Sequence, residues 1–333
     1  MSTKMVILKE VKLFLTGGTG FFGKALLRHH LSSVRSGSYQ FTVLSRNPEH
    51  FLSAYPEFNA HPSITFVKGD IQQRDSLPWD QTFTYVLHAA TDSTTGPSLT
   101  PLQRYDQIVD GTRNILDLAV ATGARRFLLT SSGAIYGPQP ADLPAIPEDW
   151  TGSPPLAESS SSYGQAKRAA EHLCSLMGEQ HGIETVVARC FAFVGPDLPL
   201  NVHFAIGNFI RDALTADAIT VCGDGSPLRT YLDQTDLAHW LFTLMERGHS
   251  GEAYNVGSDY VISIADLAYL VRDVLAPDKP VHILGAPNHQ VARNRYVPDI
   301  RKAQQEMGLS VTVPLPDAIR LSPPYAEGFD RAN

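Results

Sequence analysis

Several features of other protein classes are scarce in this sequence of 333 residues. Its three cysteines are scattered and form no Cys-x-x-Cys pair, so we expect neither a disulfide framework nor a metal site. No apolar run approaches the roughly 20 residues that a membrane-spanning helix needs. The first residues carry lysines around only a short apolar run, unlike a signal peptide. We therefore expect a cytoplasmic protein with reduced cysteines and no membrane partner.

Positive charge is also in short supply. The 27 Lys and Arg residues are outnumbered by 34 Asp and Glu residues, which gives a formal net charge of −7. Nucleic-acid binding normally requires a basic face, so we expect no such partner. Hydrophobic residues make up 43% and charged residues 18%, as in ordinary globular proteins. The length allows one large domain, or a large domain and a smaller one.

Short apolar runs alternate with helical patterns through the first half of the chain, which is typical of a parallel sheet built from strand–helix–strand units. We expect strands near 11–16, 41–45, 64–67, 85–89, 127–131 and 185–189, with helices near 22–34, 102–122 and 163–180. Beyond Gly195 the alternation breaks down. The pattern predicts an α/β fold: a Rossmann-type doubly wound sheet over residues 1–190, with elements returning near 220–260, and a smaller substrate-binding lobe over 191–333.

A glycine-rich turn follows the first expected strand. Gly17, Gly20 and Gly23 are spaced as Gly-x-x-Gly-x-x-Gly between that strand and a helix. Such a turn brings the backbone close to a pyrophosphate, and the helix N-terminus offers unpaired N–H groups to the phosphates. We therefore expect an NAD(P) cofactor here, held by Gly17, Thr19, Gly20, Phe21, Phe22 and Gly23.

The ends of the next strands suggest which dinucleotide is bound. The second strand ends at Ser45-Arg46, and no acidic residue lies between positions 41 and 48. An acidic residue at this place bonds the adenosine ribose, whereas Arg accommodates a 2′-phosphate. Ser45 and Arg46 therefore favour NADP(H) over NAD(H), although Arg46 could also be a solvated loop cation. Further cofactor candidates follow the third and fourth strands: Asp70, Ile71, Ala89 and Ala90. His88 is expected to be a buried histidine with its hydrogen bonds satisfied.

Three polar side chains form a candidate catalytic group. Tyr163 and Lys167 are four residues apart on one face of an expected helix, where a lysine cation could stabilise the phenolate. Ser132 follows the strand at 127–131, whose carboxyl end faces the ligand crevice of such a sheet. Ser132 could bond the same substrate oxygen to which Tyr163 gives a proton. A serine, a tyrosine and a lysine in this order predict hydride-transfer chemistry.

At this point the chain resembles the extended short-chain dehydrogenase/reductase family of nucleotide-sugar epimerases, dehydratases and reductases. The resemblance runs from about Val11 to Leu309. Its matching pieces are the glycine turn, Asp70-Ile71, His88-Ala-Ala, Gly111-Thr-Arg-Asn, Ser131-Ser-Gly-Ala-Ile-Tyr-Gly137, Tyr163-x-x-x-Lys167, Arg189-Cys-Phe-Ala-Phe-Val-Gly-Pro196, Gly223-Asp-Gly-Ser-Pro-Leu-Arg-Thr-Tyr231, Tyr254-Asn-Val-Gly257 and Arg295-Tyr-Val-Pro-Asp299.

The resemblance implies roles for particular residues. Ser132, Tyr163 and Lys167 carry over as the catalytic trio, with Tyr163 and Lys167 also touching the cofactor. Phe191 and Val194 would lie near the nicotinamide. Substrate contacts carry over to Thr91, Ser132, Arg229 and Arg295, the arginines being candidates for the diphosphate of a nucleotide-sugar. The resemblance also implies a homodimer through the helices near 102–122 and 163–180.

Departures from the family pattern bear on the reaction. The family's 4,6-dehydratases carry an Asp-Glu pair directly after the catalytic hydroxyl, where this chain has Gly133-Ala134. Ala192 and Ile108 replace common asparagines. The missing Asp-Glu pair disfavours dehydration, whereas Ala192 removes the family's usual UDP-sugar contact and Ile108 removes part of its usual polar support. Because Arg46 suggests NADPH, we expect reduction of a 4-keto(-6-deoxy) sugar nucleotide. Epimerisation stays open as the alternative, and a non-catalytic NADP sensor is a weaker one. The sequence leaves the base and the sugar open.

Overall fold

The computed structural model describes residues 11–32, 39–59, 61–91, 99–202, 204–286 and 294–323. Its central feature is a seven-stranded sheet in the order β11-β6-β5-β4-β1-β2-β3. Every neighbouring pair of strands in it is parallel. The strands are β1 (Val11–Thr16), β2 (Tyr39–Ser45), β3 (Ile64–Lys68), β4 (Tyr85–His88), β5 (Arg126–Ser132), β6 (Glu184–Cys190) and β11 (Ala253–Val256). The doubly wound α/β fold predicted from the sequence is confirmed.

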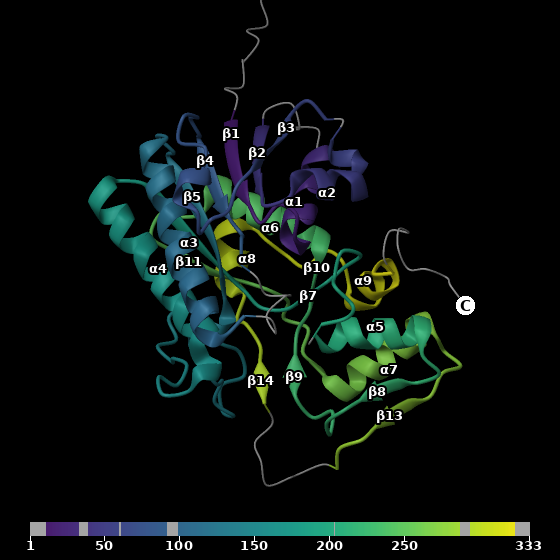
Figure 1. The fold of residues 1–333 in the computed structure, drawn as a ribbon. Helices are drawn as coiled ribbons and strands as arrows, with labels where there is room; N and C mark the ends of the chain where they lie inside the picture. The colour runs from purple at the N-terminus through teal and green to yellow at the C-terminus, as the bar shows by residue number, and fades with distance from the viewer. Residues whose placement is uncertain are drawn as a thin grey trace, which may run out of the picture.

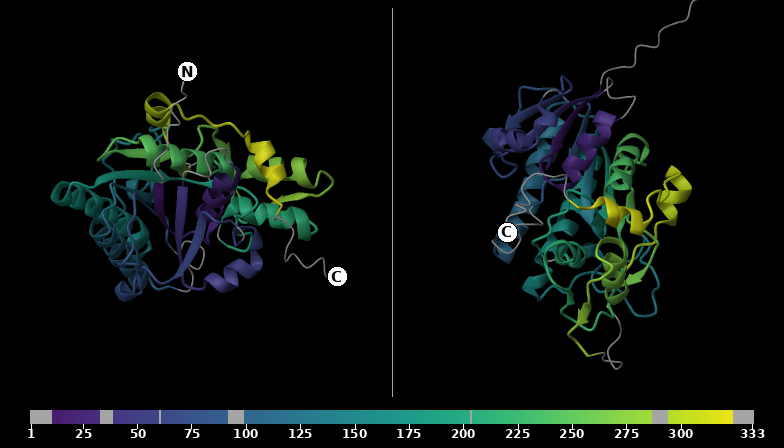
Figure 2. Two further views of the ribbon diagram at one scale, coloured as in Figure 1. Left: turned by 90° about the horizontal axis from the view of Figure 1, so that it is seen from above. Right: turned by 90° about the vertical axis from the view of Figure 1, so that its right-hand side faces the viewer.

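Helices cover both faces of the sheet, as the continuous apolar strands require. Leu13, Phe14 and Leu15 on β1 are fully buried, so neither face of this strand meets water. Side chains from α1 (Phe21–Ser32), α6 (Gln234–Arg247) and α8 (Arg301–Met307) share one core. Those of α3 (Pro101–Ala121) and α4 (Ser162–His181) share a second core on the other face. Figure 2 shows the sheet between these two layers.

The two long helices on the second face are delimited by local signals. α3 begins with a capping box, in which Thr100 and Gln103 exchange side-chain and backbone hydrogen bonds, and Pro101 occupies its first position. α4 ends at Gly182, whose φ of 71° is the left-handed conformation that favours glycine. These caps set where α3 begins and where α4 ends, and α4 carries both Tyr163 and Lys167.

A smaller lobe follows the central sheet in the chain. It contains α5 (Ala205–Thr215), α7 (Ile264–Leu275) and α9 (Leu315–Leu321), which pack around an apolar core of their own. Short strands complete the lobe or join it to the sheet: β7 (Phe193–Val194), β8 (Ile219–Val221), β9 (Leu228–Arg229), β10 (Leu232–Asp233), β12 (Ile262–Ser263), β13 (Val281–Ile283) and β14 (Arg295–Tyr296). Figure 1 shows this lobe below and beside the central sheet.

Some elements have too little pattern to be expected from the sequence. The edge strand β11 is only four residues long, and its partner β6 lies some sixty positions earlier in the chain. α2 (Pro48–Ala54), α8 and α9 have seven residues each, too few for a clear helical period. Among the helices that the structure describes, none is long and apolar enough to cross a membrane.

Candidate active site

The glycine turn between β1 and α1 places its three glycines in different surroundings. Gly17 has φ of 74°, and a Cβ there would lie 2.5 Å from the Ala89 carbonyl oxygen. A Cβ on Gly23 would lie 2.2 Å from the Gly18 Cα, so this glycine lets the helix approach the turn. Gly20 is exposed, and its Cβ would meet only the Gly17 oxygen at 3.4 Å. Packing does not require a glycine at position 20, which fits close approach of a ligand.

The other cofactor candidates lie around this turn. β1, β2 and β4 are parallel and in register. Ser45, which ends β2, and Ala89, which follows β4, therefore lie next to Thr16 at the end of β1. Arg46 is exposed directly after β2, and Thr19 in the turn is half-buried. Asp70 is half-buried after β3, with its carboxylate accepting from the Gln72 N–H group at 3.0 Å. Ile71 is buried, whereas Ala89 and Ala90 are half-buried at the end of β4.

The two phenylalanines of the turn also have a packing role. The rings of Phe22 and Phe193 meet edge to face, with centroids 5.1 Å apart, and Phe21 lies 6.4 Å from the same ring. Phe193 belongs to β7, which leads into the smaller lobe. The glycine turn is therefore anchored to the start of that lobe.

His88 is a buried histidine with both ring nitrogens satisfied. Nδ1 lies 2.7 Å from the Thr16 hydroxyl oxygen, and Nε2 lies 3.2 Å from that of Thr112. Burial, aided by the charge of Lys167, lowers the pKa of His88 to about 3. The ring is thus neutral at physiological pH and stabilises the strand ends. The structure confirms the core assignment made from the sequence.

Ser132, Tyr163 and Lys167 meet at the carboxyl ends of β5 and β6. Ser132 ends β5, is 7% exposed and accepts a hydrogen bond from the Ala134 N–H group at 3.1 Å. The Lys167 Nζ donates to the Thr91 hydroxyl at 2.7 Å and to the Thr130 carbonyl at 2.8 Å. It lies 5.9 Å from the centre of the Tyr163 ring. The structure therefore brings the predicted trio together, with Thr91 beside the lysine.

The pKa values of Tyr163 and Lys167 differ from the expectation that the lysine cation lowers the pKa of the tyrosine. Burial raises the pKa of Tyr163, and a hydrogen bond with Ser132 and the charge of Arg104 oppose that rise. Burial lowers the pKa of Lys167 to about 8, so the ammonium is close to its titration point. The lysine bonds Thr91 and Thr130 rather than the phenol. In the free protein, burial therefore outweighs any lowering of the Tyr163 pKa by the charge of Lys167.

The predicted substrate arginines lie on two-residue strands of the smaller lobe. Arg229 on β9 is opposite Tyr296 on β14, whereas Arg295 is opposite Leu228. Because successive side chains in a strand point to opposite faces, Arg229 and Tyr296 share one face and Arg295 lies on the other. Burial lowers the pKa of Arg229, and its Nη1 donates to the Leu228 carbonyl at 2.8 Å. The structure does not bring the two arginines together on one face.

Tyr296 is a site residue that the sequence reasoning missed. Its hydroxyl lies 3.5 Å from that of Ser132, and its ring packs on Phe191 with centroids 4.6 Å apart. The segment Arg295–Asp299 stood out in the sequence, but only its arginine was considered. Position 296 lies more than 160 positions from Ser132, and β14 is too short to predict. Nothing local in the sequence therefore placed this phenol beside the serine.

The two residues predicted near the nicotinamide have different surroundings. Phe191 follows β6 and packs between Tyr136 and Tyr296 at the catalytic edge. Val194 on β7 is fully buried in the core of the smaller lobe. Phe191 thus lines the space beside Ser132, whereas the side chain of Val194 packs against lobe residues.

Position 133 has no room for a side chain. A Cβ on Gly133 would lie 2.7 Å from both the Phe191 Cζ and the Tyr296 hydroxyl oxygen. Real Cβ contacts are essentially never this short. An acidic residue therefore cannot occupy this position without moving both rings.

Among the described residues, no group of His, Cys, Asp and Glu could hold a metal ion.

Comparison with known proteins identifies the family. Residues 13–257 match the model of the NAD dependent epimerase/dehydratase family. The chain belongs to this family. It is an enzyme of the extended short-chain dehydrogenase/reductase type, as the motifs predicted.

Individual relatives agree with this assignment. The chain is 30% identical to UDP-glucuronic acid decarboxylase 1 of Danio rerio over 94% of its own length and 72% of the relative's. Two solved structures share the fold. UDP-glucose 4-epimerase from Thermotoga maritima has a TM-score of 0.78 and 22% identity, with 93% of this chain and 97% of that chain covered. RMD from Pseudomonas aeruginosa, complexed with NADPH, has a TM-score of 0.75 and 24% identity, with the same coverage.

Proposed function

We propose that this enzyme is an NADP-dependent oxidoreductase that reduces the keto group of a 4-keto(-6-deoxy) nucleotide-sugar. One observation carries the proposal: Ser132, Tyr163 and Lys167 meet beside a position 133 that excludes any proton-transferring side chain. The site can therefore give one proton to one oxygen, as reduction of a ketone requires once its carbon has received the hydride. The bound cofactor would supply the hydride.

The side chains divide the remaining work among them. Tyr163 would give its proton to the developing alkoxide; burial raises the pKa of its phenol, so Tyr163 carries that proton at neutral pH. Ser132 would donate a hydrogen bond to the same oxygen, since its own oxygen already accepts from Ala134. Lys167 would supply a buried positive charge next to Thr91 and the nicotinamide ribose. Arg229 and Thr91 would hold the substrate, and Arg295 is kept as a weaker candidate.

Elimination and decarboxylation fit this site less well. Elimination of water needs an acid and a base next to the catalytic hydroxyl, and Gly133-Ala134 provide neither. The Danio rerio relative is a decarboxylase of a glucuronic acid. The substrate of such an enzyme carries a carboxylate, and the two side chains that lie against Gly133 beside Ser132, Phe191 and Tyr296, offer it no positive charge. Epimerisation remains the second candidate because the family description includes it.

The deciding assay follows NADPH absorbance with a 4-keto-6-deoxy nucleotide-sugar, alongside UDP-glucose and UDP-glucuronic acid. We expect stoichiometric NADPH loss with the keto sugar, and none with the Tyr163→Phe variant. Interconversion of two epimers without net change in the cofactor would replace the reductase by an epimerase. Release of carbon dioxide from UDP-glucuronic acid would replace it by a decarboxylase.

We also propose that NADP(H) binds at least about tenfold more tightly than NAD(H), a difference of roughly 1.4 kcal/mol. The support is Arg46, exposed after β2 at the place where a 2′-phosphate is accommodated. Titration of both cofactors by fluorescence measures the ratio. Arg46→Ala should reduce NADP(H) affinity and leave NAD(H) affinity almost unchanged. Equal affinities in the natural protein would contradict this assignment.

We propose a homodimer through α3 and α4. Among the apolar residues of these two helices, Leu116, Leu118 and Met177 are buried in the core of the chain itself. Leu176 is 45% exposed, and it lines a cavity of about 370 Å³ on the outer surface together with Leu173. Sedimentation of the natural protein and of Leu176→Glu tests this interface. Leu284→Glu, at an exposed leucine of the smaller lobe, is the matched control.

Two broader expectations remain proposals. We propose that residues 1–190 with returning elements near 220–260 form the dinucleotide-binding domain, and that 191–333 mainly bind the substrate. The support is that β11 joins the central sheet while α5, α7 and α9 share a separate core. A cytoplasmic location is supported by three cysteines that are all unpaired. Cell fractionation would test the location.

A further inference from the structure

The helix that carries Tyr163 and Lys167 also carries a carboxylate one turn further on. Glu171 lies four residues after Lys167 and therefore on the same face of α4. Its Oε1 accepts a hydrogen bond from the Ser131 hydroxyl at 2.5 Å, and its Oε2 accepts from the Arg189 Nη2 at 2.9 Å. Ser131 directly precedes Ser132, so Glu171 joins the helix to the strand end that bears the serine.

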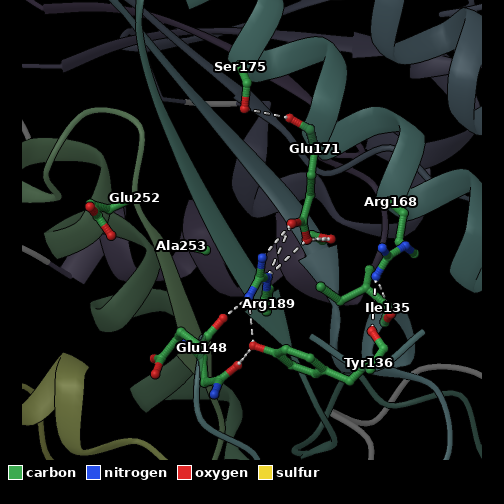
Figure 3. Close-up of polar contacts among 12 residues, drawn as sticks. Ile135, Tyr136, Glu148, Arg168, Glu171, Ser175, Arg189, Glu252 and Ala253 are labelled. Carbon is green, nitrogen blue, oxygen red and sulfur yellow. Dashed lines mark hydrogen bonds and ion pairs between the residues drawn. The ribbon is translucent and has the colours of Figure 1, made fainter. Parts of the chain in front are cut away.

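Arg189 extends this connection to the other side of Ser132. It lies opposite Ser131 in the register of β5 and β6. Its Nη1 donates to the Tyr136 hydroxyl at 2.8 Å and to the Glu148 carbonyl at 2.7 Å. Tyr136 closes the short turn that follows Ser132. Figure 3 shows Arg189 between Glu171 and Tyr136, so the serine segment is anchored on both sides by one ion pair.

The ion pair also contributes to the charge balance around Lys167. Burial raises the pKa of both thiols that face the lysine, Cys174 on α4 and Cys190 on β6, so they are neutral. His88 on β4 is neutral as well, and Tyr163 keeps its proton because burial raises its pKa. Thr91 and the Thr130 carbonyl are uncharged partners.

Among the described residues around Lys167, Glu171 is the neighbour that carries a charge. This charge opposes the lowering of the lysine's pKa. Arg104 acts on Tyr163 instead. Glu171 is itself balanced by Arg189, and both side chains are largely buried, with 13% and 15% exposed. Removing either charge would therefore leave the other one unbalanced near the lysine.

We propose that Glu171 and Arg189 are positioning residues of this site: their ion pair fixes the segment around Ser132 and supplies a balanced charge beside Lys167. The role rests on the proposed function, because it serves proton transfer by the trio. Neither residue needs to touch substrate or cofactor. The pair acts through Ser131, Tyr136 and the lysine.

The charge balance can be measured without any substrate. The chain has eight lysines, so the titration of each can be followed by NMR in protein labelled with ¹³C-lysine, and Lys167→Met assigns the signal. Glu171→Gln leaves Arg189 unbalanced and should lower the titration midpoint of Lys167 by roughly one pH unit. Arg189→Met leaves Glu171 unbalanced and should raise it. The double variant should return close to the natural value.

A second ion pair between the same two strands serves as the control. Arg126 and Glu184 are joined at 2.5 Å at the opposite ends of β5 and β6, about 16 Å along the strand from Ser131. Glu184→Gln and Arg126→Met should leave the Lys167 midpoint unchanged. Shifts of the same sign in Glu171→Gln and Arg189→Met, or equal shifts in the control variants, would overturn the proposal.

Arg189→Lys separates position from charge and is a milder change if Arg189→Met does not fold. It keeps the charge but loses the guanidinium that bonds Glu171 and Tyr136 together. The Lys167 midpoint should stay near its natural value, while turnover of the substrate found by the NADPH assay should fall at least about tenfold. Full turnover in this variant would refute the positioning of the serine segment. Because the lysine titration needs no reaction, failure of the proposed reductase activity leaves the charge test intact.

Discussion

The two sides of the candidate site are built differently. On the catalytic side, Ser132 and Lys167 are buried, and long elements of the central sheet and α4 hold them through several hydrogen bonds. On the substrate side, Arg229 and Tyr296 are half-buried and lie on strands of only two residues. The proposed catalytic residues thus lie on long elements, whereas the residues proposed to select a substrate lie on strands of two residues.

The largest effect is expected on the catalytic side. Tyr163→Phe removes the proposed proton donor but keeps the ring, so kcat should fall about 10²–10⁴-fold while cofactor affinity stays nearly unchanged. Ser132→Ala should cost less, because it removes a hydrogen bond and no proton donor. Lys167→Ala should reduce both turnover and cofactor affinity. Stopped-flow kinetics and cofactor titration measure these quantities, with Tyr269→Phe, at an exposed tyrosine of α7, as the control. If Tyr163→Phe kept the natural turnover, Tyr163 would not be the proton donor.

On the substrate side, the two arginines should behave differently because they lie on opposite faces of β9 and β14. Arg229→Met should raise KM for the nucleotide-sugar about 10–100-fold, the loss expected for a hydrogen bond between charged groups. Its kcat should change much less. Arg295→Met should have a smaller effect on KM. Steady-state kinetics with saturating cofactor decide between them, and equal effects would mean that the strand register does not separate their roles.

The position of the candidate catalytic trio could be predicted from the sequence for a physical reason. Ser132 ends β5, and Tyr163 and Lys167 lie in the first two turns of α4, while parallel strands collect their carboxyl ends at one edge of the sheet. Ser132 and the glycine turn could therefore be placed from local patterns. Tyr296 and β11 could not, because their positions depend on pairings between distant short segments. The Glu171–Arg189 pair was missed for the same reason, since only the register of β5 and β6 brings Arg189 to Ser131.

Between the two sides, Gly133 is the point of closest approach. Gly133→Ala adds a methyl group where Phe191 and Tyr296 already lie 2.7 Å from the Cβ position, which should lower the free energy of unfolding by about 1–3 kcal/mol. Activity should fall because the two rings must move away from Ser132. Gly223→Ala is the control, since its Cβ would meet nothing within 4 Å. Chemical denaturation compares the variants. Equal stability of the two would show that the rings can move freely.

A further effect is expected at His88, which is buried below the strand ends of the catalytic side. His88 is 3% exposed, and its pKa falls from 6.5 to about 3 on folding, so between these values the unfolded chain binds a proton that the folded one does not. Its contribution to stability is therefore complete above pH 6.5 and is lost as the pH falls towards 3. Within that window the loss is about 1.4 kcal/mol per pH unit. His30, whose pKa is lowered to about 4 by burial and by His61, adds to the loss.

The test compares how stability changes with pH rather than stability itself. Urea denaturation between pH 7 and pH 5 should give an average slope for His88→Asn that is smaller than the natural one by about 1 kcal/mol per pH unit, because His88 contributes little to the slope above pH 6.5. His172→Asn, at an exposed histidine of α4, should keep the natural slope. If His88→Asn also kept the natural slope, His88 would bind a proton in the folded protein. Water would then reach the region around His88, next to Thr16 and Lys167. The difference in burial between the catalytic side and the half-exposed substrate side would then not include the residues below the strand ends.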